Sequence, residues 1–217
     1  MKKIIAASLA ALLAAMPISA AALKVDNNAE IPKLVLDGTW ENPFLDVAVG
    51  DWFYDGVMFA YGKGMMNGVG DGAFAPSATL TRAMMITVLY RNAGSPQASG
   101  APFSDVGAES WYAGAAAWGS ASKVVSGTDD GRFLPEAQIT REQLAVMLYN
   151  YAKLTGKQMK TGGAAFEDSA EISPWAAEAM DAMTASGILG GDAEGRLRPK
   201  SSATRAETAV ILKRFFE

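Results

Sequence analysis

Three arginine residues occupy equivalent positions, each directly after a threonine that we expect to start a helix: Arg82, Arg141 and Arg205. A cation at the first helical position adds to the positive end of the helix macrodipole, which costs roughly a few tenths of a kcal/mol. Such a charge, placed three times at one position, requires an anionic partner. The planar guanidinium group binds a carboxylate at two points, and the free N–H groups of a helix start bind anions as well. These residues therefore point to recognition of an acidic group.

Two kinds of anion could meet this requirement. One lies inside the chain, because an aspartate precedes each arginine, and a bidentate ion pair between them would hold a loop to the helix. The other is the acidic group of a ligand. The two interpretations are compatible if each aspartate orients an arginine toward the ligand. The aspartates are Asp46, Asp105 and Asp168.

A tryptophan and a glycine lie between each aspartate and its arginine. A tryptophan at a helix start is commonly part of the core, where its large ring supplies packing area. Beside a loop glycine and an aspartate, it also fits a sugar site, in which the ring stacks on a pyranose and the glycine lets the ligand approach the backbone. The residues are Trp52, Trp111 and Trp175, with Gly68, Gly127 and Gly191.

All of these residues follow one spacing. Each of the three tryptophans stands 16 residues before its glycine and 29 residues before its Thr-Arg pair. Self-similarity at a fixed period is the signature of a repeat protein, whose units bury their apolar faces against one another. The sequence therefore predicts three copies of one unit.

Each unit is predicted to contain two helices joined by a loop, which gives an all-α fold. The first helix begins near the tryptophan, and in the third unit Ser173 is suited to the N-cap and Pro174 to the first helical position. Apolar side chains at helical spacing then predict a core face. They are Val57, Phe59 and Ala60, then Ala116, Trp118 and Gly119, then Met180, Ala182 and Met183.

The second helix starts at the threonine. Thr140 with Gln143, and Thr204 with Glu207, are predicted to form capping boxes. The loop between the helices has glycines four residues apart, which indicate tight turns with positive φ. Its acidic residues allow a calcium-binding interpretation, but no copy has the Asp-x-Asp-x-Asp-Gly series that ends in a bidentate glutamate. We therefore expect no metal.

The order Phe-x-Asp-Val, Trp-Tyr, Gly-x-x-x-Gly-x-Phe-x-Pro and Thr-Arg-Ala-Glu, tripled over residues 43–217, resembles the S-layer homology (SLH) domain family. The resemblance implies a bacterial cell-surface protein whose repeats, at 43–94, 101–156 and 164–217, form a pseudo-threefold helical bundle. It further implies noncovalent anchoring to the wall through secondary cell-wall polysaccharide, often pyruvylated, held in grooves between neighbouring repeats.

The ligand residues that this resemblance implies are the aspartates, tryptophans, glycines and arginines named above. The sequence departs from the family pattern in three places. Met84 replaces the acidic residue of the first capping box, Ser169 stands where valine is expected, and the stretch from Asp168 to Trp175 is one residue longer than its counterparts. The last two departures predict a reshaped third groove.

Residues 1–22 have the layout of a secretory signal: a basic start, an apolar run from Ile4 to Met16, and small residues before the expected cleavage site. The run is too short to span a bilayer. We therefore expect export. An N-terminal arm at 23–42 follows, whose short apolar run at 34–36 fits either an extra strand or a flexible segment.

The composition argues against several classes of protein. The chain has no histidine and no cysteine, so the commonest general base, the commonest nucleophile, disulfides and thiolate metal sites are missing together. Without the two lysines of the signal, 17 basic residues face 23 acidic ones, a formal charge of −6. An acidic protein is unsuited to nucleic acid or to an anionic membrane surface.

We therefore expect a monomeric, noncatalytic wall-binding module without a cofactor, whose partner is the polysaccharide or peptidoglycan. A protein that self-assembles into a surface layer is the second interpretation, and a wall-polysaccharide hydrolase the third, because the aspartates come one per unit whereas a glycosidase needs an unequal pair of carboxyl groups. For the architecture, we expect one helix from each unit at the centre, with Val57, Ala116 and Met180 buried close together.

Overall fold

The computed structural model describes residues 41–217, so the signal at 1–22 and nearly all of the arm at 23–42 lie outside the described residues. Two short 3-10 turns, η1 and η2, precede α5, and no strand forms within 41–217, where only isolated bridges pair extended residues. The predicted all-α fold is confirmed. The elements of this part are α1 (Tyr54–Gly62), α2 (Arg82–Asn92), α3 (Ala113–Ala121), α4 (Arg141–Thr155), η1 (Ser169–Glu171), η2 (Pro174–Ala176), α5 (Ala177–Ala185) and α6 (Arg205–Phe216).

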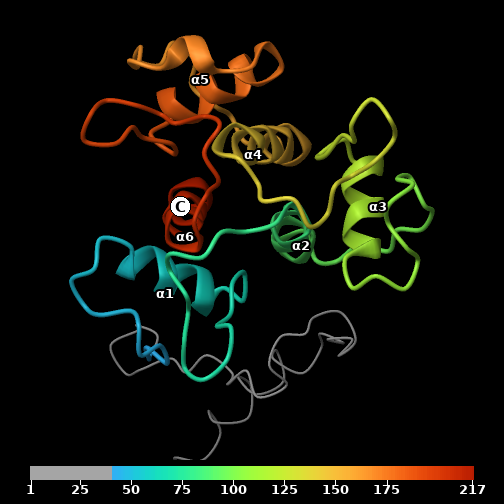
Figure 1. The fold of residues 1–217 in the computed structure, drawn as a ribbon, viewed down its shortest axis with the longest axis horizontal. Coiled ribbons are helices and arrows are strands. Elements are labelled where there is room, and N and C mark those ends of the chain that lie inside the picture. Colours follow the sequence, from blue (N-terminus) through green and yellow to red (C-terminus); the bar gives the residue numbers. More distant parts are fainter. Residues whose placement is uncertain (1–40) are drawn as a thin grey trace, which may run out of the picture.

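The second helix of each repeat lies at the centre of the molecule and the first helix at the outside. Figure 1 shows α2, α4 and α6 grouped around the middle, with α1, α3 and α5 set around them at three separate places. Each outer helix packs on the central helix of the preceding repeat, α3 on α2 and α5 on α4. The ring closes because α1, from the first repeat, packs on α6, from the last. The three repeats therefore form a pseudo-threefold bundle.

Three backbone segments meet where the central helices begin. The N–H of Ile139 donates to the carbonyl of Leu80 at 2.9 Å, that of Ala203 donates to Ile139 at 3.0 Å, and that of Leu80 donates to Ala203 at 3.3 Å. All three residues are buried, and each directly precedes the threonine that caps a central helix. This closed cycle of hydrogen bonds fixes the three helix starts against one another.

The prediction that Val57, Ala116 and Met180 lie close together was wrong. All three side chains are buried, but they belong to the outer helices, and each outer helix packs on a different central helix. Gly56, for example, lies so close to α6 that a Cβ added to it would be 2.8 Å from Val210. The helices that follow the hydrogen-bonded cycle take the centre instead, because their N-termini are already joined there.

The helix starts follow the predicted caps with one exception. Complete capping boxes begin α4 and α6. In α2, the side-chain oxygen of Thr81 accepts from the N–H of Met84 at 3.3 Å, without the reciprocal half of the box. Ser173 is the N-cap residue of η2 and Pro174 its first residue, as predicted. The exception is that the Ser173 hydroxyl group makes no capping hydrogen bond and donates to Glu142 instead.

Candidate functional site

Each of the three repeated aspartates holds the loop between the two helices of its own repeat. Its two carboxylate oxygens accept hydrogen bonds from the N–H groups of two consecutive loop residues, at 2.7 and 2.8 Å in every repeat. The second residue of each pair has a φ between 51° and 58°, a left-handed conformation that costs a non-glycine residue about 1 kcal/mol or more. The carboxylate stabilises that conformation. The pairs are Phe74 and Ala75 with Asp46, Phe133 and Leu134 with Asp105, and Leu197 and Arg198 with Asp168.

These hydrogen bonds contribute to the ionisation of Asp105. Burial acts to raise the pKa of its carboxyl group, but the N–H groups of Phe133 and Leu134, together with its own N–H group and the charge of Arg132, hold the pKa below its ordinary value. The group is therefore ionised at neutral pH, and the folded protein loses this contribution only in acid.

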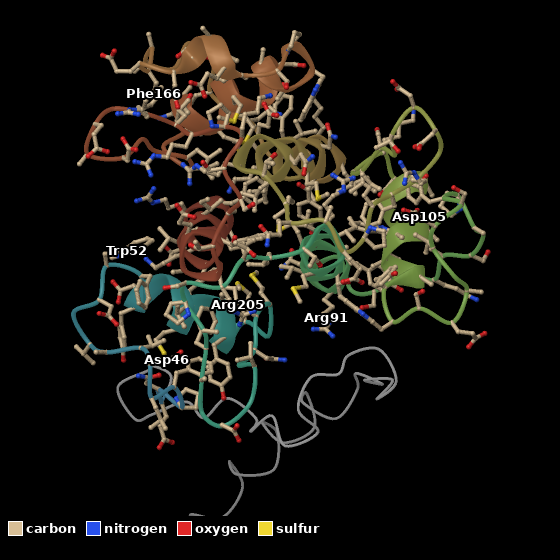
Figure 2. All side chains as sticks on the ribbon, in the orientation of Figure 1. Asp46, Trp52, Arg91, Asp105, Phe166 and Arg205 are labelled. Carbon is tan, nitrogen blue, oxygen red and sulfur yellow. The ribbon has the colours of Figure 1, made fainter. Side chains whose placement is uncertain are left out.

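Each of the three repeated arginines crosses to the loop of the next repeat. Its Nε donates to the carbonyl of the residue whose N–H the aspartate holds, and its Nη2 donates to a second carbonyl of the same loop. Figure 2 shows Arg205, from α6, among the residues of the first repeat. Arg82 binds Phe133 at 2.8 Å and Ser126 at 3.3 Å, Arg141 binds Leu197 at 2.6 Å and Gly190 at 2.9 Å, and Arg205 binds Phe74 at 2.7 Å and Asn67 at 2.5 Å.

No direct ion pair joins these aspartates and arginines within residues 41–217, so that interpretation was wrong. The two side chains instead grip one loop residue from opposite sides, the aspartate at its N–H and the arginine at its carbonyl. We call this arrangement the Asp-Arg clamp. It joins neighbouring repeats at a first junction (Arg82 with Asp105), a second junction (Arg141 with Asp168) and a third junction (Arg205 with Asp46).

The first N–H groups of the central helices are occupied as well. In α2, the N–H groups of Arg82 and Ala83 donate to the carbonyls of Ala137 and Pro135, both at 2.9 Å, and α4 and α6 repeat this pattern. The carbonyl oxygens supply the negative partner that a cation at a helix start requires. These N–H groups are therefore not free to bind a ligand.

The three guanidinium groups are largely withdrawn from solvent. Arg82 and Arg141 are buried and Arg205 is half-buried, and burial lowers the pKa of all three from its ordinary value. Arg82 and Arg205 lie over the rings of the loop residues that they bind, 4.9 Å from the ring centre of Phe133 and 4.5 Å from that of Phe74. These cation–π contacts strengthen the clamp.

One nitrogen of each guanidinium group, Nη1, takes no part in the clamp. In Arg141, it forms an ion pair with Glu207 at 3.3 Å. In Arg82 and Arg205, Nη1 has no hydrogen-bond partner among the described residues. Neither nitrogen is fully enclosed by protein atoms. Two of the three junctions therefore keep a guanidinium nitrogen that can donate to a ligand.

The tryptophans are more exposed than a core role allows. Trp52 and Trp175 are 67% and 58% exposed, and Trp111 is half-buried. The interpretation of these residues as core was therefore wrong for Trp52 and Trp175. Trp52 stands edge-on to Phe53, with ring centres 5.3 Å apart, and Figure 2 shows it at the outside of the first repeat.

The three glycines that follow the first helices face an aromatic ring. A Cβ added to any of them would lie 2.9 to 3.0 Å from the ring of the phenylalanine that opens the same repeat. They have no positive φ, which belongs instead to the second glycine of each loop. The first glycine is thus required for packing, and the phenylalanine is a site residue that the sequence reasoning missed although it precedes the aspartate in every copy. The packed pairs are Gly68 with Phe44, Gly127 with Phe103, and Gly191 with Phe166.

The third repeat differs from the others at the residue that follows the repeated aspartate. Val47 and Val106 are buried in the first two repeats, whereas Ser169 at the equivalent position is exposed. A pocket of about 190 Å³ opens here, lined by Ser169, Phe166 and Met180 among others. The serine and the additional residue between Asp168 and Trp175 are the two sequence differences of the third repeat in this region.

The second junction contains a buried carboxylate that the sequence reasoning also missed. Glu142, at the second position of α4, is 3% exposed. Its Oε2 accepts from the N–H of Ser173 at 3.0 Å, and its Oε1 accepts from the hydroxyl group of Ser173 at 3.1 Å and from Nζ of Lys200 at 2.7 Å. That Nζ lies 6.0 Å from the ring centre of Trp175. The ion pair between Lys200 and Glu142 thus lies near the ring of Trp175.

Residues 41–217 hold no group of three or more acidic side chains placed to bind a metal ion. Their helices are also too short or too polar for any of them to cross a membrane.

A comparison with protein families bears on this geometry. The S-layer homology domain matches residues 43–85, 102–145 and 165–209, which together make up more than half of the chain. The chain belongs to the S-layer homology (SLH) domain family. Each matched segment runs from the phenylalanine and aspartate, through the tryptophan and the glycine, into the central helix that the arginine begins.

Several SLH relatives are much longer proteins. The chain is 31% identical to the surface-layer 125 kDa protein of Lysinibacillus sphaericus, over 71% of this chain and 13% of that protein. It is 31% identical to an amylopullulanase of Thermoanaerobacterium thermosulfurigenes, over 75% of this chain and 9% of the enzyme. It is 26% identical to a cellulosome-anchoring protein of Acetivibrio thermocellus, over 70% of this chain and 35% of that protein. The chain therefore spans only a minor part of each relative.

Proposed function

We propose that this chain is an exported, noncatalytic cell-surface protein whose three SLH repeats bind the bacterial cell wall noncovalently. Membership of the SLH family supports this function, as do relatives that are named as a surface-layer protein and as a cellulosome-anchoring protein. The enzymes among the relatives do not argue for catalysis here, because the chain matches only a small part of each, 9% of the amylopullulanase for example.

For the ligand, we propose secondary cell-wall polysaccharide that carries an acidic group such as a ketal-linked pyruvate, with peptidoglycan as the alternative polymer. The observation that carries this proposal is the 67% exposure of Trp52, since an exposed tryptophan forgoes burial worth about 2 kcal/mol or more. Each repeat has one tryptophan at this position, exposed in the first and third repeats and half-buried in the second. A pyranose can stack on the ring, while a free guanidinium nitrogen at the same junction donates to the acidic group.

The clamp would serve this site by preorganisation. The aspartate and arginine fix the loop between them before any ligand arrives, so binding would order few additional side chains. The glycine packed on its phenylalanine keeps the same loop close to the segment that opens the repeat. The tryptophan and the guanidinium nitrogen would then be the groups that touch the sugar, and the aspartate and glycine would position them.

Self-assembly into a surface layer is the second candidate, because the first repeat exposes several large apolar side chains. Leu45 is 89% exposed, Val49 82% and Val69 58%. Exposed apolar groups of this kind favour association between protein molecules. They identify the first repeat as the surface on which self-assembly would occur.

Sedimentation with purified wall sacculi separates these functions. We expect the protein to pellet with sacculi, to lose this ability once the secondary polymer is extracted, and to bind less after Trp52→Ala combined with Trp111→Ala. Leu154→Ala, at a side chain of α4 that is 48% exposed, is the matched control and should pellet like the wild type. Pelleting that survives extraction would identify peptidoglycan as the ligand, and concentration-dependent pelleting without sacculi would identify self-assembly.

A further inference from the structure

We propose that the three junctions are not equivalent: at the second junction Glu207 pairs with the spare guanidinium nitrogen of Arg141 and Glu142 pairs with Lys200, so that the acidic groups of the polymer bind only at the first and third junctions. This inference rests on the proposed function, because it concerns the same ligand. Carboxylates of the chain itself keep the acidic ligand out of the second junction.

The partners of Glu142 are the kind that a ligand carboxylate would require. A backbone N–H, a hydroxyl group and an ammonium group converge on its two oxygens. Its side chain is 4% exposed while that of Lys200 is 51% exposed, so the carboxylate lies beneath the lysine, whose Nζ is 6.0 Å from the ring centre of Trp175. A second carboxylate here would have to compete for the same donors and approach a like charge, which is unfavourable.

The other two junctions have no such carboxylate. The position of Glu142 in α4 is taken by Ala83 in α2 and by Ala206 in α6, and neither side chain has a charge or a hydrogen-bonding group. The donors of the second junction are therefore satisfied from within the chain, whereas the helix position that supplies this carboxylate carries no charge at the first and third junctions.

The spare guanidinium nitrogen, Nη1, also distinguishes the second junction from the first and third. Arg141 pairs its Nη1 with Glu207, the third residue of the next central helix, α6. The third residues of α4 and α2 are Gln143, whose oxygen accepts from a backbone N–H in its own capping box, and Met84, which has no charge to offer. The guanidinium groups of the first and third junctions consequently keep the nitrogen that the second has already used.

The number of binding sites tests this proposal directly. Isothermal titration of the protein with a pyruvylated hexosamine methyl glycoside should give two sites per chain, and the unpyruvylated glycoside should bind at least tenfold more weakly. Trp52→Ala and Trp111→Ala should each remove one site, whereas Trp175→Ala should leave both the number of sites and their affinity unchanged. Three sites in the wild type, or a loss with Trp175→Ala equal to that with Trp52→Ala, would overturn the proposal.

Two substitutions test the mechanism at the residues themselves. Met84→Glu places a carboxylate at the third position of α2, where it should pair with Arg205 and weaken binding at the third junction at least tenfold, with Met84→Gln as the uncharged control. Glu142→Ala should add a third, weaker site. If Met84→Glu binds as tightly as Met84→Gln, the proposed role of the spare nitrogen is wrong. If the wild type binds neither the glycoside nor sacculi, the proposed function itself fails, which is a different result from three equal sites.

Discussion

At the scale of single residues, the arginine at each helix start works as a link between repeats. Arg82 places its charge on carbonyl oxygens of the second repeat, over the ring of Phe133. The cost of a cation at the positive end of α2 is offset because the same loop also accepts the first N–H groups of the helix. The residue therefore contributes to stability whether or not its remaining nitrogen binds a ligand.

Arg82→Ala should consequently lower the free energy of unfolding by about 2 kcal/mol, because hydrogen bonds of a charged group contribute about 1.5 to 3 kcal/mol and two loop carbonyls lose their donor. Arg82→Lys should recover only part of the loss, since one ammonium group cannot reproduce the planar fork. Urea unfolding at neutral pH measures the effect. Arg132→Ala, at an exposed arginine paired with Asp130, is the control and should change stability by less than about 0.5 kcal/mol. Unchanged stability in Arg82→Ala would show that the clamp is dispensable.

Asp105 predicts a dependence of stability on pH. Because its pKa in the folded protein is held below the ordinary value, its stabilising contribution is present above the unfolded-state pKa of about 3.9 and is lost as pH falls through the folded-state pKa. Asp105→Asn should cost about 1 to 2 kcal/mol at pH 7, because an amide can accept only one of the two N–H groups. The difference from the wild type should shrink below about pH 3.9. Unfolding curves from pH 7 to pH 3 test this, with Asp129→Asn in the exposed loop as the control; a difference that stays constant with pH would contradict it.

At the scale of the elements, the loop between the helices is as closely packed as the helices themselves. Gly127→Ala should destabilise the protein by about 1 to 3 kcal/mol, because the new Cβ would lie 2.8 Å from the carbonyl oxygen of Arg132 and 2.9 Å from the ring of Phe103. Gly114→Ala is the matched control: its Cβ would meet only the side chain of Tyr90, no closer than 3.5 Å, and alanine is the better helix former. Thermal unfolding should show a lower Tm for the first variant and an equal or higher Tm for the second. Equal Tm values for both would mean that the loop can move away from the ring.

At the scale of the whole molecule, the bundle closes only when all three repeats are present. The outer helix α1 packs on α6, so its buried face, which includes Val57 and Ala60, depends on the last repeat. The cycle of backbone hydrogen bonds likewise takes one member from each repeat. A chain that ends at Gly156 lacks both partners and should show no cooperative thermal unfolding by circular dichroism. A cooperative transition at the wild-type Tm would show that the repeats are independent domains.

The sequence determined the features that depend on neighbouring residues. The repeat spacing gave the number of units, and the threonine caps gave the starts of α2, α4 and α6, because an N-cap acts within one helical turn. The apolar spacing of the first helices gave their buried faces. The residues that recur at fixed positions also identified the members of the clamp, although not the way in which they meet.

Only the tertiary structure decided which repeat each side chain contacts. Arg82 binds a residue 51 positions away and Arg205 one 131 positions away, and nothing in the local sequence specifies such a partner. The sequence suggested an ion pair between the aspartate and the arginine of one repeat. In the fold, these two residues belong to different junctions. The reason is physical: an SLH repeat cannot cover its own apolar helix, so each outer helix is buried against the preceding repeat and each polar link follows the same offset around the ring.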